Sequence, residues 1–288
     1  MFPDILTRCS TKIRQELLSV SWGAHSITAL YLSLLSGVIV SLQYNPGTAY
    51  YSANSLDAVV PFGAFWRSLH FFSSQVFFLF SVIHFIVLIA QGKHRKINRS
   101  NWYLLTSSFA VLLLILFTGY VLRGDATGSF AGIIAENIIL SVPILGKWIN
   151  YFLFSIAESG LTRVFSNHMV GLCLIWLFMS WNHIRHYSIS LYRSAEFSLL
   201  LVLFCMFVQA PMEPEKLGVF KVNGPWFFLG LQEMLKYIPP FWAGVFFPGS
   251  LIVALLYMNR GGVIERISRY YVFGWLSVYL CLSLIILL

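Results

Sequence analysis

Seven apolar stretches are the feature that most limits how this chain can fold. They cover residues 24–43, 68–91, 102–122, 164–183, 195–210, 241–258 and 270–288. A helix needs roughly 20 mostly apolar residues to cross the hydrocarbon core of a bilayer. Charged residues make up only 10% of the chain, whereas about a quarter is typical of a soluble domain. The sequence therefore predicts an all-α, polytopic membrane protein.

The basic residues predict how the chain is oriented in the membrane. Of the 19 lysines and arginines, 12 fall in connections on one side and 7 on the other, and the richer side is expected to be cytoplasmic. This places the N-terminus inside, in a bacterial cytoplasmic membrane. The net charge of +8 then reflects topology and does not indicate nucleic-acid binding. The segment Phe2–Val20 resembles an interfacial amphipathic helix more than a cleaved signal.

Four histidines lie inside the apolar stretches in two pairs. His70 and His84 are 14 residues apart, and His168 and His183 are 15 apart. These spacings are close to four helical turns, so each pair lies along one helix face, about 21 to 22 Å apart. Neutral histidine is a common axial ligand of haem iron. Two such helices facing each other would therefore hold two b-type haems, each between one imidazole from either helix.

The remaining histidines and the cysteines carry weaker signals. His25, His94 and His186 are expected near the inner face, in contact with water. His186, beside Arg185, is also a candidate contact for an inner quinone or a haem propionate. The four cysteines form no CxxC or CxxCH motif, so neither covalent haem attachment nor a zinc site is expected.

Several short motifs accompany the histidine pairs. Gly23 and Gly37, again 14 residues apart, occur in SWGAH and LSGVI, and QYNP follows them. Arg67 lies in WRSLH, Gly119 in FTGYVL, and Arg163 in LTRVFSNH. A glycine inside a helix is unfavourable unless close packing requires it. Together these motifs resemble cytochrome b of the quinol-oxidising bc complexes over nearly the whole chain.

This resemblance implies an architecture and a set of partners. Residues 1–190 would form a four-helix bundle with two haems, the outer between His70 and His168 and the inner between His84 and His183. Residues 191–288 would add three transmembrane helices around a quinone pocket, as if two family subunits were fused. The glycines would let a haem approach the backbone, and Arg67 and Arg163 would bind propionates. Iron–sulphur or c-type cytochrome subunits, quinone, lipid and a second copy of the chain are the expected partners.

The chain also departs from the family pattern. Leu105 stands where the family has a second glycine on the third helix, and RGDA follows the FTGYVL motif in place of a Pro-Trp-Gly sequence. GPWFF replaces the Pro-Glu-Trp-Tyr motif, whose glutamate the family uses in quinol oxidation. Glu233 is the candidate substitute as outer proton acceptor, with Asp125, Glu136 and Glu158 as rivals. The loop 124–160 resembles the surface helices that cover the outer quinone pocket.

Three functions remain open at this point. The first is the diheme cytochrome b subunit of a respiratory quinol or quinone oxidoreductase, an electron-transfer subunit that is not catalytic alone. The second is a diheme anchor that conducts electrons for a peripheral dehydrogenase and has a single quinone site. The third is a channel or transporter whose histidines relay protons. The repeated glycine and arginine–histidine spacings favour the haem-binding functions, because a proton relay does not require them.

Overall fold

A computed structural model describes residues 15–187, 191–215 and 222–288. Every regular element in these residues is a helix, which confirms the predicted all-α class. Most of the predicted interfacial helix Phe2–Val20 lies outside the described residues.

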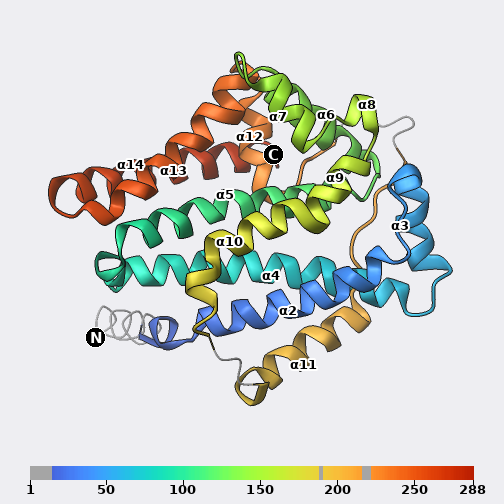
Figure 1. The fold of residues 1–288 in the computed structure, drawn as a ribbon, viewed down its shortest axis with the longest axis horizontal. Coiled ribbons are helices and arrows are strands. Elements are labelled where there is room, and N and C mark those ends of the chain that lie inside the picture. Colours follow the sequence, from blue (N-terminus) through green and yellow to red (C-terminus); the bar gives the residue numbers. More distant parts are fainter. Residues whose placement is uncertain (1–14, 188–190, 216–221) are drawn as a thin grey trace.

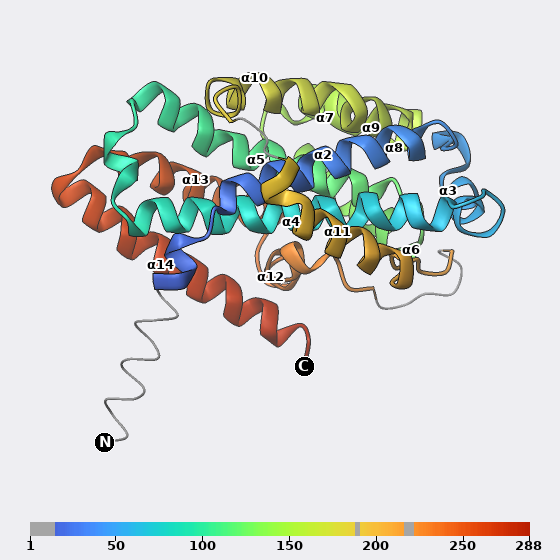
Figure 2. The same ribbon diagram turned by 90° about the horizontal axis from the view of Figure 1, so that it is seen from below.

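Four long helical segments form a bundle (Figure 1). They are α2 (Trp22–Ser41), α4 (Gly63–Ala90), α5 (Arg99–Val121) and a segment from Thr162 to Ile184 that contains α9 and α10. Helix α2 packs along α4, and α5 packs along α10. Viewed from below, the same four segments run side by side (Figure 2). The two histidine-bearing helices therefore belong to one bundle.

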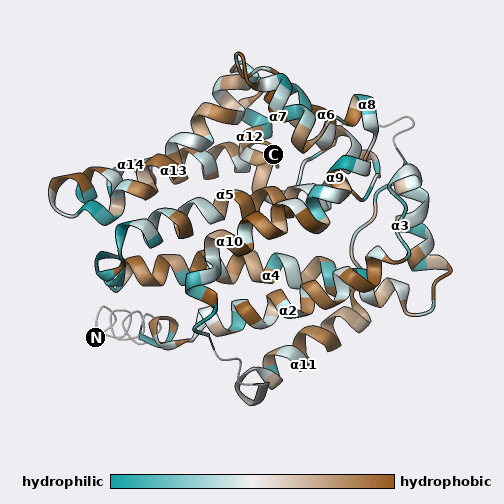
Figure 3. Cartoon of the chain, in the orientation of Figure 1, coloured by the Kyte–Doolittle hydropathy of each residue, from teal (hydrophilic) through white to brown (hydrophobic). Residues whose placement is uncertain are grey.

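Five helical segments of the described chain are long and apolar enough to cross a membrane. Four are the bundle segments, and the fifth runs from Trp242 to Arg260. The other two predicted spans are also helical, but they are not among the five segments that are long and apolar enough to cross a membrane. Helix α11 (Leu191–Phe207) has 17 residues, and α14 (Gly262–Ile285) carries charged residues in its first two turns. Figure 3 shows apolar residues along the helices and polar residues gathered near their ends.

Shorter elements connect the long helices or make up the Thr162–Ile184 and Trp242–Arg260 segments. The α-helices are α3 (Ala49–Ala58), α6 (Ala126–Leu140), α7 (Gly146–Leu153), α8 (Ile156–Ser159), α9 (Thr162–Ser166), α10 (Leu172–Ile184), α12 (Leu229–Met234) and α13 (Phe247–Tyr257). The other helical turns are η1 (Pro46–Thr48), η2 (Lys93–Lys96), η3 (Asn167–Gly171), η4 (Trp226–Phe228), η5 (Trp242–Phe246) and η6 (Met258–Arg260). Helices α12 and α13 pack against α14, and α13 also packs against α5. Helices α12 to α14 thus lie on the α5 side of the bundle, whereas α11 packs against α2 and α4.

A buried apolar cluster joins the bundle to the helices after α5. Phe117 and Val121 on α5 pack with Phe154, Val164 and Phe227. These residues come from four separate parts of the sequence, and each is at most 8% exposed. Their burial holds α6, α7 and the segment before α12 against the C-terminal end of α5.

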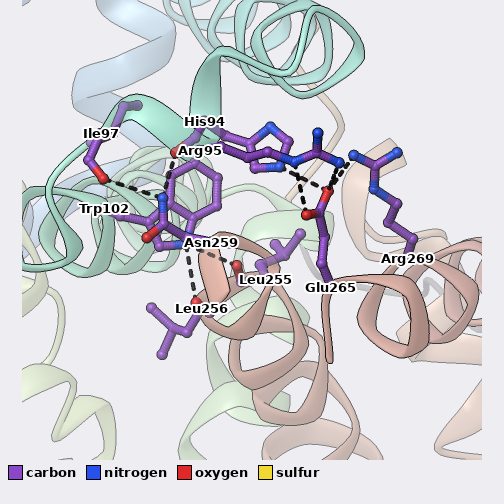
Figure 4. A network of polar contacts seen from close by, with 9 residues as sticks. All are labelled: His94, Arg95, Ile97, Trp102, Leu255, Leu256, Asn259, Glu265 and Arg269. Atoms are coloured by element: carbon purple, nitrogen blue, oxygen red, sulfur yellow. Dashed lines mark hydrogen bonds and ion pairs between the residues drawn. The ribbon is translucent and has the colours of Figure 1, made fainter. Parts of the chain in front are cut away.

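A polar network joins the opposite end of the bundle to α14 (Figure 4). The imidazole of His94 is completely buried and donates from Nε2 to Oε1 of Glu265 at 3.1 Å. Arg95 donates to both carboxylate oxygens at 2.9 Å, and Arg269 donates to Oε1. The prediction that His94 contacts water is therefore wrong, because its ring is buried inside the protein with Nε2 paired to the Glu265 carboxylate from α14.

His25 and His186, the other two histidines expected in contact with water, differ from each other in burial. His25 is half-buried, with its ring 5.3 Å from the Phe197 ring and 6.4 Å from the Phe80 ring. The prediction of a solvated His25 is therefore also wrong, because α11 packs over this end of α2. His186 is exposed, as expected.

Replacing Glu265 with alanine is expected to lower the free energy of unfolding by about 1–3 kcal/mol, the usual cost of a buried donor without a partner. The buried His94 would lose its acceptor, and Arg95 and Arg269 would lose theirs. Chemical denaturation of the purified protein measures the change. The exposed Glu158, which accepts a hydrogen bond from Ser155 at 3.0 Å, is the control, and its alanine variant should stay within about 0.5 kcal/mol of wild type.

The same site predicts a dependence of stability on pH. Hydrogen bonds from Arg95, and then from His94 and Arg269, lower the pKa of Glu265 to about 2, against the opposing effect of burial. A lowered folded-state pKa stabilises the protein above the ordinary value of 4.5, and this stabilisation is lost as the pH falls toward 2. The thermal midpoint of the wild type should therefore fall over this window more steeply than that of Glu265→Ala. Parallel curves would contradict the assignment.

Candidate functional site

The two histidine pairs face each other across the bundle. The ring of His70 on α4 lies 6.2 Å from the ring of His168, measured between centroids. The rings of His84 and His183 lie 6.0 Å apart. His70 pairs with His168 and His84 with His183 because α4 and the Thr162–Ile184 segment run in the same direction, so that the earlier histidine of each lies at the same end. The structure thus brings together the four histidines in the predicted pairs.

These separations fit a metal between each pair. A metal held by two imidazole nitrogens at about 2 Å from each puts the ring centroids about 6 Å apart, because each nitrogen lies about 1 Å from its ring centre. The observed values of 6.2 and 6.0 Å meet this requirement. Two protein ligands per metal leave four further positions, which is the number that a porphyrin supplies to iron.

Hydrogen bonds orient both outer imidazoles. Nδ1 of His70 lies 2.8 Å from the carbonyl oxygen of Ser33, and Nδ1 of His168 lies 3.0 Å from that of Ile115. A carbonyl only accepts, so Nδ1 carries the hydrogen in each ring and Nε2 keeps a lone pair for a metal. The hydroxyl of Thr118 also lies 3.0 Å from Nδ1 of His168. Sequence reasoning missed these partners, because a backbone carbonyl has no signature in the sequence.

The inner pair holds a buried nitrogen that lacks a partner. Nε2 of His84 is buried and has no hydrogen bond within the described part of the chain. A buried polar atom without a partner is costly, and a bound metal would satisfy it. His183 faces Tyr187 as well as His84, with ring centroids 6.0 Å apart. His186 is exposed three residues away, so its predicted contact with a propionate or a quinone stays a prediction.

The three glycines identified in the sequence motifs, Gly23, Gly37 and Gly119, lie against histidine rings. A Cβ on Gly37 would stand 2.7 Å from Cε1 of His70, and one on Gly119 would stand 2.9 Å from Cε1 of His168. A Cβ on Gly23 would meet the hydroxyl of Tyr187 first and would stand 3.2 Å from Cε1 of His84. The structure therefore places a histidine ring beside each glycine, and the expected contact with a haem face stays a prediction. In both descriptions the missing Cβ makes room for the same site.

The two predicted propionate arginines bind protein groups. Arg67 is buried and donates to Asp57 from Nε at 2.7 Å and from Nη2 at 2.5 Å, and it also donates to the carbonyl oxygen of Ala210 at 2.7 Å. Arg163 donates to the carbonyl oxygen of Tyr151 and lies 4.2 Å over the centre of its ring. Both arginines lie near the outer pair, and their propionate role stays a prediction.

A cavity of about 160 Å³ opens beside the outer end of α5. Its walls come from α5, from α6 and from the segment 222–235, which includes Gly224, Pro225 and Phe228 of the GPWFF sequence. Thr127 and Gln232 are the polar side chains of its lining, and no ionisable side chain lines it within the described residues. The segment that replaces Pro-Glu-Trp-Tyr thus faces an apolar pocket without a carboxylate.

The four candidate proton acceptors lie outside this lining. Glu233 is 1% exposed and interacts with Nζ of Lys236 at 2.5 Å and the hydroxyl of Tyr237 at 3.1 Å. Its sequence neighbour Gln232 lines the cavity.

The rivals of Glu233 hold structural hydrogen bonds. Asp125 is buried and accepts from Arg123 and from the backbone N–H of Gly128 at 2.9 Å, capping α6. Glu136 accepts from Asn150 at 2.8 Å, and Glu158 is exposed. Asp125 and Glu136 thus have structural roles, so an acidic residue in the loop 124–160 does not by itself indicate proton transfer.

Comparison with known proteins agrees with this site. The model of the family described as cytochrome b/b6/petB matches residues 10–188. Cytochrome b of Dictyostelium discoideum is 25% identical over 87% of this chain and 74% of its own length. Cytochrome b of Schizosaccharomyces japonicus is 27% identical over 51% of this chain, and the match spans only 39% of that protein.

The fold has a solved counterpart. A chain of a hyperthermophilic respiratory Complex III superposes with a TM-score of 0.71 at 19% identity, over 92% of this chain and 86% of that one. The family match covers all four bundle segments and all four facing histidines. The chain is therefore a polytopic membrane protein of the cytochrome b family, whose members bind b-type haem.

Proposed function

We propose that this chain is the diheme cytochrome b subunit of a respiratory quinol or quinone oxidoreductase of the bc type. The observation that carries the proposal is the pair of facing imidazoles at 6.2 and 6.0 Å, on helices that place one pair near each side of the bundle. The division into a diheme bundle over residues 1–190 and a quinone-pocket region over 191–288 belongs to this proposal.

The residues of the bundle would hold two b-type haems. His70 and His168 would ligate the outer one, and His84 and His183 the inner one. When bound, b-type haem supplies one-electron transfer, so two haems would carry electrons between the two sides of the membrane. The carbonyl oxygens of Ser33 and Ile115 orient the imidazoles of His70 and His168. Burial of the site excludes water.

The membrane setting and partners follow the same proposal. The connections rich in arginine and lysine would face the cytoplasm of a bacterium, with the N-terminus on that side. Iron–sulphur or c-type cytochrome subunits would accept or deliver electrons at the outer face, and a second copy of the chain is a further proposed partner.

The outer cavity would bind the ring or tail of a quinone, because its described lining is apolar apart from the side chains of Thr127 and Gln232. Glu233 is the proposed proton acceptor, since Gln232 beside it lines the cavity. The second candidate function is a diheme electron conduit with a single quinone site elsewhere. The lack of an ionisable side chain in the described cavity lining favours this alternative.

A redox titration of the purified protein with haem quantification tests the proposal. Two b-type haems with separate midpoint potentials are expected, because the two imidazole pairs lie in different surroundings. Addition of quinone or a quinone-site inhibitor should shift the outer potential if this subunit oxidises quinol. A shift confined to the inner haem would instead support the conduit, and a spectrum without b-type bands would refute both.

Filling the outer cavity is expected to weaken quinone binding there. Ala131 on α6 lines the cavity, and Ala131→Trp should weaken binding at this site about tenfold or more, because overpacking costs about 1–3 kcal/mol. Titration of the outer haem spectrum with quinone measures the change. Ile133→Trp is the control, because Ile133 is 38% exposed and does not line the cavity. Equal quinone affinity in both variants would contradict the assignment.

A further inference from the structure

A second cavity lies at the end of the protein opposite the quinone pocket, where α14 begins. It has a volume of about 640 Å³. Three arginines, Arg95, Arg266 and Arg269, line it together with Glu265 and the backbone from Gly261 to Val263. Three positive charges against one negative charge leave this lining net positive. Neither the histidine pairs nor the outer pocket uses these residues.

The carboxylate of Glu265 positions two of these arginines. It is buried and accepts hydrogen bonds from both Arg95 and Arg269, which come from different parts of the chain (Figure 4). The arginines themselves remain open, with side chains 59% and 44% exposed. Part of each guanidinium thus binds Glu265, and the remaining N–H groups of Arg95 and Arg269 are available to another acceptor.

The guanidinium of Arg266 has no polar partner within the described part of the chain. Among the described residues it forms no hydrogen bond or ion pair, and its side chain is exposed at the cavity. The backbone adds further donors. Gly261 and Gly262 have φ values of 75° and 58° and begin the 24-residue helix α14. The first N–H groups of such a helix have no intrahelical partner and favour an anion.

The position of the cavity points to the source of the anion. It directly follows the membrane-spanning segment Trp242–Arg260, and Arg95 lies between α4 and α5, where two further spans end. Exposed apolar side chains continue from it along α14, with Val263, Ile264 and Ile267 at 68%, 48% and 62% exposed. A phosphate held by the arginines would therefore have acyl chains beside these apolar residues.

We propose that this cavity binds the phosphate of an anionic phospholipid headgroup from the leaflet on the arginine-rich side of the membrane. Basic pockets between membrane helices on the cytoplasmic side bind anionic headgroups in this way. Arg266 contributes the unpaired guanidinium, and Glu265 fixes the other two. The lipid would join α14 to the turn between α4 and α5.

Native mass spectrometry of the full-length protein in detergent tests the site. The probes are a short-chain phosphatidylglycerol, the matching phosphatidylcholine and inorganic phosphate. Phosphatidylglycerol is expected to bind at one saturable site, and Arg266→Gln should weaken it about fivefold, the contribution of one arginine near an anionic surface. Arg266→Lys should restore most of the affinity. Arg266 holds no protein group, so these variants should fold, and circular dichroism checks this.

Lys96→Gln is the matched control. Lys96 lies in the same turn as Arg95 but does not line the cavity, so its variant should bind phosphatidylglycerol as the wild type does. An equal loss in both variants would indicate general surface charge and overturn the site. Equal affinity for phosphatidylcholine, or unchanged binding by Arg266→Gln, would overturn it as well. Inorganic phosphate that binds as tightly as phosphatidylglycerol would overturn the lipid as the ligand.

Discussion

His84→Ala is expected to remove the inner of the two proposed haems and leave the outer one bound. The imidazole of His84 faces His183 at 6.0 Å between centroids, and its buried Nε2 has no hydrogen-bond partner in the described chain. Without it, His183 alone would remain to hold a haem at this site, and the pocket would open. Haem extraction and quantification should therefore give half the wild-type haem per protein, with the outer potential nearly unchanged.

His25→Ala provides the control for this experiment. It removes an imidazole from the same end of the bundle, but the ring of His25 packs against Phe80 and Phe197, not against a second histidine. Its haem content should match the wild type. A full complement of haem in His84→Ala, or an equal loss in His25→Ala, would refute the bis-histidine assignment of the inner site.

Gly37→Ala is expected to have the second largest effect, at the outer site. The added Cβ would stand 2.7 Å from Cε1 and 2.9 Å from Nδ1 of His70, and the hydrogen bond from Nδ1 to the carbonyl oxygen of Ser33 prevents easy movement of the ring. Overpacking of this kind costs about 1–3 kcal/mol, so haem binding at the outer pair should weaken about tenfold to a hundredfold. The redox titration should show loss of the outer component first.

Gly274→Ala is the matched control for Gly37→Ala. Gly274 lies inside α14, and a Cβ there would meet nothing within 4 Å. Alanine in a helix interior is favoured over glycine by about 1 kcal/mol, so this variant should be slightly more stable and keep both haems. The same substitution thus has opposite expected effects at the two positions. Loss of outer haem from both variants, or from neither, would contradict the role given to Gly37.

The glycine positions show how much of the site could be predicted from local sequence. Gly23, Gly37 and Gly119 were identified from their spacing, and each lies against one of the predicted histidines. The expected contact of these glycines with a haem face stays a prediction. Spacing reports which residues share a helix face, but the identity of the facing group depends on how α2 and α5 cross their neighbours.

Charged residues were harder to place from sequence. Arg67 was associated with a propionate, and in the structure its guanidinium donates to Asp57, which is ten positions earlier and in a different helix. His94 was expected in water and is buried against Glu265, which lies 171 positions later. Partners at such separations leave no periodic pattern in the chain. Only the packing of α14 on the rest of the protein brings them together.

The order of residues alone determined that this chain is a bundle of membrane helices with four histidines in two facing registers, because hydrophobic length and helical period are local properties. Tertiary structure alone decided which carbonyl oxygens orient His70 and His168, that the GPWFF segment faces a cavity whose described lining has no carboxylate, and that three arginines line one cavity with Glu265. These outcomes depend on contacts between segments distant in sequence, and such contacts are set when the helices pack.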